Sequence, residues 1–79
     1  MPARELFDHS TALGKVGRRI RSLVEFSGVS QGTTAQVIQA DPSGSGYTLA
    51  IQWELPEHRA WPLVNWFSRS EYDRFLVEV

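Results

Sequence analysis

Residues 14–34, GKVGRRIRSLVEFSGVSQGTT, combine an alternating segment with a loop that contains two glycines. From residue 15 to Phe26 most apolar residues occupy even positions, and arginine or glutamate occupies odd ones. This period of two predicts a half-buried first strand whose even positions face the core. Gly28 and Gly32 can adopt positive φ, so a long loop that turns back sharply is predicted after Phe26.

A hairpin is predicted in the middle of the chain. Residues 33–41 are rich in β-branched side chains and predict a second strand, and DPSGSG at residues 41–46 is a strong turn signal. In the return strand one parity is aromatic or aliphatic and is expected to face the core. The residues of that parity are Tyr47, Leu49, Ile51 and Trp53.

The last part of the chain predicts a short strand, a capped helix and a terminal strand. Residues 63–67 form the fourth strand, after a loop bounded by Pro56 and Pro62. Ser68 and Glu71 match the S-x-x-E capping box, in which each side chain bonds the backbone N–H of the other residue. A short helix should therefore begin there and lead into a strand at residues 77–79.

The first dozen residues lack this alternation. They could form one or two helical turns beginning near Pro2, but so short a helix is marginal on its own. We therefore expect residues 1–13 to be a loosely docked tail or a short helix, and residues 14–79 to form one domain. The alternative for the first segment is that Leu6 and Phe7 anchor it on the domain or on a partner subunit.

The composition is that of one small domain. The chain has 79 residues and no cysteine, and eight Lys and Arg against nine Asp and Glu give a net charge of −1. A core of this size is only marginally sufficient, and no disulfide or thiolate metal site can supplement it. The charge lacks the positive field that favours nonspecific nucleic-acid binding. No apolar run resembles a membrane span or a signal peptide, so we expect a cytoplasmic protein.

The order of these features resembles that of the SH3-like small β-barrels over residues 14–79. The resemblance is carried by GRRIR at residues 17–21, the F-x-G-x-x-x-G-T loop at residues 26–33, the glycine hairpin turn and the helical turn before the last strand. It implies an all-β barrel of about five strands, with one short helical turn and a possible short N-terminal helix. Such domains occur as compact bacterial and phage-type modules and as accessory subunits of enzymes, so the resemblance implies a contact module more than a catalyst.

Three tryptophans within fourteen residues are the strongest indication of function. Large rigid rings bury much area at little entropic cost, which enriches them at binding hot spots. Parity places Trp53 in the core, whereas Trp61 lies in a loop and is as open to exposure as to burial. Trp66 and Phe67 lie on opposite faces of the fourth strand, and the pattern leaves open which of them faces outward.

A basic cluster in the first strand completes the candidate surface. Arg19 and Arg21 share one parity, so together they could contact phosphates or an acidic partner. The alternative is a solvated edge strand that its charge protects from aggregation. The candidate interaction surface combines Arg19, Arg21, Arg59, Trp61 and Trp66.

No residue pattern indicates an enzyme. His9 and His58 have no third ligand at zinc spacing and no nucleophile motif, so neither a metal nor a cofactor is expected. The favoured function is a non-catalytic interaction or accessory module that binds a protein partner or another copy of itself. Nucleic-acid binding through the strand from Arg18 to Arg21 is the alternative.

A remote alternative is an oligomeric enzyme with a shared central pocket, by analogy with the type II dihydrofolate reductases. The string closest to the folate-binding and nicotinamide-binding segment of those enzymes is AIQW at residues 50–53. It lies on the return strand of the hairpin and its residues are in a different order, so that site is not transferred to this chain.

Overall fold

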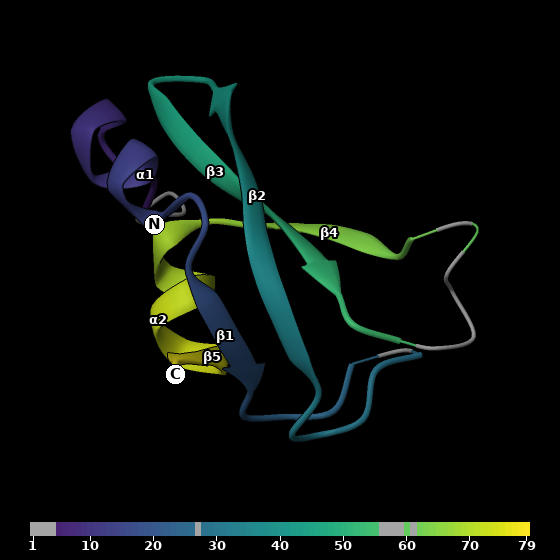
Figure 1. Cartoon of the computed structure of the whole chain (residues 1–79). Coiled ribbons are helices and arrows are strands. Elements are labelled where there is room, and N and C mark those ends of the chain that lie inside the picture. The colour runs from purple at the N-terminus through teal and green to yellow at the C-terminus, as the bar shows by residue number, and fades with distance from the viewer. Residues whose placement is uncertain (1–4, 27, 56–59, 61) are drawn as a thin grey trace.

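The computed structural model describes residues 5–26, 28–55, 60 and 62–79, and this part of the chain is mostly β-structure (Figure 1). Within it, five antiparallel strands form one open sheet in the order β4-β3-β2-β1-β5, accompanied by two short helices. The elements in chain order are α1 (His9–Lys15), β1 (Arg19–Ser22), β2 (Thr34–Ser43), β3 (Gly46–Trp53), β4 (Val64–Phe67), α2 (Arg69–Phe75) and β5 (Leu76–Glu78).

The β2–β3 hairpin forms the centre of the sheet. Its strands pair as far as Ser43 and Gly46, which leaves only Gly44 and Ser45 as the turn. Gly44 has a φ of +61°, a conformation that glycine adopts without steric cost. The predicted turn is confirmed, but it is tighter than the six-residue motif because strand pairing continues through residues 41–43.

β1 is shorter than the strand predicted over residues 15–26. It comprises only Arg19–Ser22, in which Ile20 is fully buried. Val16 and Val24, which the alternation assigns to the core, are both exposed. The physical reason at the first end is Gly17, whose φ of +93° turns the chain out of α1, so that it becomes extended only at Arg19.

The amino-terminal segment is anchored on the hairpin. α1 begins at His9 and is capped by the Asp8 carboxylate, whereas residues 5–7, part of the segment predicted to be helical, are not helical. Phe7 instead forms a β-bridge with Tyr47 through two backbone hydrogen bonds of 3.0 and 2.9 Å, and its side chain is buried. Of the two alternatives for this segment, the structure therefore shows the anchored one.

The capping box at the start of α2 is confirmed. The Glu71 carboxylate accepts a hydrogen bond of 2.8 Å from the Ser68 backbone N–H, and the Ser68 hydroxyl accepts one of 3.3 Å from the Glu71 backbone N–H. α2 passes directly into β5, where Leu76 pairs with Ser22 of β1. Neither of the helices in the described residues is long and apolar enough to cross a membrane.

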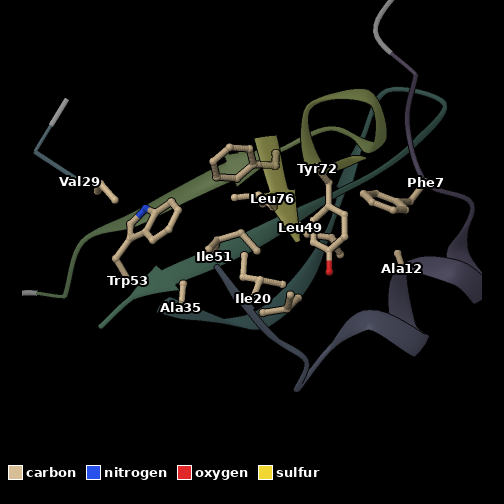
Figure 2. Close-up of a cluster of buried hydrophobic side chains, with 12 residues drawn as sticks. Phe7, Ala12, Ile20, Val29, Ala35, Leu49, Ile51, Trp53, Tyr72 and Leu76 are labelled. Atoms are coloured by element: carbon tan, nitrogen blue, oxygen red, sulfur yellow. The ribbon is translucent and has the colours of Figure 1, made fainter. Parts of the chain in front are cut away.

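The core lies along the inner face of the sheet (Figure 2). Trp53, assigned to the core by its parity, is buried, and it lies with Val29 at one end of the cluster. At the other end the Phe7 ring meets the Tyr72 ring edge-on, with 5.6 Å between the ring centroids. The helices contribute Ala12 from α1 and Tyr72 from α2, so both ends of the chain close the same core.

Candidate interaction surface

Strand pairing defines the outer face of the sheet, which points away from the core. Residues directly opposite each other on neighbouring antiparallel strands project from the same face. One row of directly opposite residues crosses the four strands from β1 to β4. It consists of Arg19 (β1), Gln36 (β2), Gln52 (β3) and Val64 (β4). Arg21 is two residues from Arg19 in β1, and Trp66 is two residues from Val64 in β4. Both therefore project from the same face as this row of residues. The outer face is therefore formed by Arg19, Arg21, Gln36, Gln52, Val64 and Trp66.

The structure shows which of Trp66 and Phe67 faces outward. The Trp66 side chain is 56% exposed, whereas Phe67 is buried. Its indole Nε1–H donates a hydrogen bond of 2.6 Å to Asp41 Oδ2. Trp66 is opposite Ala50 of β3, and Asp41 of β2 is opposite Thr48 of β3, so the indole must extend across β3 to reach the carboxylate. This placement accounts for the burial of Ala50 and Thr48, which are only 2% and 6% exposed on the outer face.

The Asp41 carboxylate is itself held in place. Its Oδ1 accepts a hydrogen bond from the Gln39 side-chain amide, while its Oδ2 accepts the indole N–H. The Trp66 side chain is held at its backbone by the pairing of β4 and at its ring by the hydrogen bond from Nε1. A side chain held in this way would lose little conformational entropy if a partner covered its exposed ring. The exposed ring of Trp66 is therefore held in one orientation.

Arg19 and Arg21 differ in how they are engaged. Arg19 Nη2 forms an ion pair of 2.7 Å with Glu54 Oε1, which also accepts a hydrogen bond of 2.5 Å from the Thr34 hydroxyl. Arg21 has no hydrogen-bond or ion-pair partner for its side chain among the described residues. Arg18 lies 3.7 Å from Glu78. Arg21 is therefore the cation of this strand that stays open to a partner.

Three of the five candidate residues can be placed. Arg19 and Arg21 lie on β1 and Trp66 lies on β4, and Figure 1 shows these strands on opposite sides of the hairpin. Three strand spacings separate them, roughly 14 Å across the sheet. Arg59 and Trp61 lie outside the described residues. The structure thus brings Arg19 and Arg21 together, and it places Trp66 on the same face at a distance that one partner surface can span.

Val77 and Val79 extend this surface and were not identified as candidates from the sequence. Val77 is opposite Arg21, and the Val79 backbone N–H donates to the Arg19 carbonyl at 3.1 Å. Both valines are exposed. The alternation of LVEV at the end of the chain is the signal that could have indicated them, because it places both valines on the face opposite Leu76.

A polar cluster joins α1, α2 and β5 on the other side of β1. Glu78 Oε2 accepts hydrogen bonds from Lys15 Nζ at 2.5 Å and from the Tyr72 hydroxyl at 2.9 Å. The bond from Lys15 is the main cause that lowers the pKa of Glu78. Burial, followed by the hydrogen bond to Glu78, raises the pKa of Tyr72 above its usual value. Lys15 also lies over the Tyr72 ring, 5.3 Å from its centroid, so this cluster fixes the helices to the last strand.

A cavity of about 390 Å³ lies between the two helices. Its walls are formed by Phe7, Asp8, Thr11, Lys15, Arg69 and Asp73. The charges around it are already engaged, because Lys15 is paired with Glu78 and Arg69 lies 3.9 Å from Asp73. Among the described residues, no group of three or more His, Cys, Asp or Glu could hold a metal ion.

Comparison with models of known protein families, with curated proteins and with solved structures finds no match.

Proposed function

We propose that this chain is an SH3-like β-barrel that serves as a non-catalytic interaction module and binds a protein through the outer face of its sheet. The fold part of the proposal is supported by the strand order, in which β1 lies between β2 and β5. It is also supported by the short helix between β4 and β5, which is where the SH3-like resemblance expects one. The proposal includes a cytoplasmic location, which fractionation of the producing cells would test.

The observation that carries the functional proposal is the state of Trp66. A tryptophan that is 56% exposed and held by a hydrogen bond of 2.6 Å to Asp41 presents a large apolar ring in one orientation. Aromatic side chains and arginine are the residue types enriched at protein–protein interfaces. Trp66 shares its face with Arg21, whose side chain has no ion-pair partner among the described residues, so the outer face offers both kinds of contact.

Nucleic-acid binding through Arg18, Arg19 and Arg21 gains less support. Two of these three arginines lie beside carboxylates, Arg18 beside Glu78 and Arg19 beside Glu54. Phosphate binding needs cations that are open to the backbone of the nucleic acid. Arg21 alone meets this condition in β1, so a protein partner remains the better proposal.

The proposal is tested by recovering partners of the wild-type protein, Trp66→Ala and Leu13→Ala from extracts of the producing cells. Leu13 is the matched control, because it is an exposed apolar residue of α1 with a similar exposed fraction of 54%. Loss of a hot-spot tryptophan should lower recovery of the partner by about tenfold or more, while Leu13→Ala retains it. Equal recovery by a folded Trp66→Ala variant would contradict the proposal, as would recovery that nuclease treatment abolishes.

A further inference from the structure

The open edge of β4 directs backbone polar groups away from the sheet. The Trp53 N–H donates to the Leu63 carbonyl at 3.0 Å, so these two residues form a hydrogen-bonded pair between β3 and the start of β4. Bonded and non-bonded pairs alternate along an antiparallel ladder. The N–H and C=O groups of Val64 and Trp66 therefore point to the edge, where no described strand pairs with them.

This edge strand is short, with four residues, but it lacks two of the features with which proteins protect an exposed strand, namely charged side chains and proline. Charged side chains, very short strands and strand proline are the common devices. The opposite edge, β5, has only three residues and includes Glu78. β4 has the sequence VNWF, without a charge or a proline, and its Asn65 and Trp66 are exposed. An uncharged edge does not repel an identical edge.

We propose that β4 pairs antiparallel with β4 of a second copy of this chain, about a two-fold axis that passes beside Asn65. The two sheets then continue into one another. The inference rests on the proposed interaction function and deepens it by naming another copy of the chain as a partner.

The hydrogen bonds already present select this register from its neighbours. A two-fold centred on Val64 would place Pro62 opposite the partner's Trp66, and proline has no N–H to donate. A two-fold centred on Trp66 would place Ser68 opposite the partner's Val64, but the Ser68 N–H is already bonded to Glu71 in the capping box. A two-fold centred on Asn65 pairs Val64 with the partner's Trp66 and, by symmetry, Trp66 with the partner's Val64. The backbone N–H and C=O groups of both residues that point to the edge are then all hydrogen-bonded.

The side chains of β4 place no charge at this edge. On the outer face, Val64 would lie directly opposite the partner's Trp66, whose indole extends in the other direction over β3, and this pair occurs twice in a two-fold arrangement. On the other face, Asn65 would meet the partner's Asn65. Its Oδ1 accepts a hydrogen bond of 2.7 Å from Trp53 Nε1, so its amide N–H groups remain as donors. The pairing therefore buries no charge and leaves an amide donor on each side of the axis.

The first test is the concentration dependence of the solution mass of the full chain, measured by light scattering for the wild type, Asn65→Asp and Gln31→Glu. Asn65→Asp keeps an acceptor for Trp53 but sets two carboxylates about 5 Å apart at the axis. The wild type should pass from one chain to two chains as its concentration rises, and Asn65→Asp should weaken this dimer at least about tenfold. Gln31→Glu makes the same change at an exposed loop residue and should not.

A second test reports the register directly and does not depend on the stability of Asn65→Asp. The chain has no cysteine, so Asn65→Cys introduces a single thiol. Residues in a non-bonded antiparallel pair have Cα atoms about 4.5 Å apart, which is within the range of a disulfide. Mild oxidation should therefore yield a disulfide-linked dimer of Asn65→Cys, and Gln31→Cys under the same conditions should remain a monomer.

The outcomes separate this inference from the proposed function. A wild type that stays a single chain at all concentrations, with no disulfide dimer of Asn65→Cys, overturns the edge pairing and leaves the outer-face proposal to its own test. A dimer that Asn65→Asp leaves intact but Arg21→Glu dissociates also overturns the edge pairing, because the copies then meet through the outer face. A dimer that Asn65→Asp dissociates and Arg21→Glu does not supports it.

Discussion

Glu78 should make the stability of the chain depend on pH in acid. The hydrogen bond from Lys15 lowers the pKa of this carboxyl below its usual 4.5 in the folded protein. A group of this kind stabilises the fold above its unfolded pKa, and the contribution is lost as the pH falls through its folded pKa. The gain in stability is therefore present at pH 7 and absent in strong acid.

Glu78→Gln tests this assignment, because the amide oxygen can still accept a bond from Tyr72 while the charge is removed. At pH 7 the variant should be less stable to urea by at most about 1 kcal/mol, since the ion pair is partly solvated. The difference from the wild type should shrink as the pH is lowered toward about 2, where both chains are neutral at this position. A difference that is the same at both pH values would show that the charge of Glu78 is not its cause.

For single residues, parity within a strand is sufficient to assign some side chains to the core but not others. Trp53 could be assigned to the core from the sequence because its whole strand alternates cleanly. For Trp66 and Phe67 the alternation says only that the two face opposite sides. The decision depends on pairing with β3 and on the hydrogen bond from Trp66 to Asp41, twenty-five residues away. Contacts at such separations are not encoded in a local pattern.

At the scale of elements, the amino-terminal segment is held against the hairpin by a close backbone approach at Gly46. A Cβ at this position would lie 2.6 Å from the Leu6 Cβ and 2.9 Å from the Phe7 carbonyl oxygen. Gly46→Ala should therefore displace this segment and lower the free energy of unfolding by about 2 kcal/mol, the range for overpacked sites. Thermal or urea unfolding measures this loss.

Gly14→Ala is the matched control, since nothing lies within 4 Å of the Cβ that it would add to α1. Replacing a helical glycine by alanine should stabilise the chain by up to about 1 kcal/mol. If Gly46→Ala were as stable as the wild type, the amino-terminal segment would not be packed on the hairpin as described.

Elements with a strong local signal could be predicted, and elements set by distant contacts could not. The S-x-x-E motif fixes the start of α2, and the glycine-rich turn fixes the hairpin. A possible short N-terminal helix was predicted near Pro2, whereas α1 begins at His9. Its position could not be predicted because only Ala12 of its seven residues is buried, so the segment shows no apolar period of 3.6. The first strand was predicted too long because Val16 and Val24 extend an alternation that the sheet does not use.

At the scale of the molecule, the candidate surface depends on the order of the strands. The sequence indicated Arg19, Arg21 and Trp66 from residue type and parity alone. That they share one face follows from the pairing of four strands, and that β4 has an open edge follows from the order of all five within the described residues. Neither fact has a local signature, so the structure is needed to relate the residues to one surface.

The most direct measurement of the central claim is photo-cross-linking in the producing cells, with a photoreactive aromatic residue at position 66 or, as the control, at position 13. If the outer face binds a protein, position 66 should give a discrete cross-linked product that protease removes and nuclease does not. Position 13 should give no such product. Cross-linking that is absent at position 66, or equal at the two positions, would contradict the assignment of this face as the binding surface.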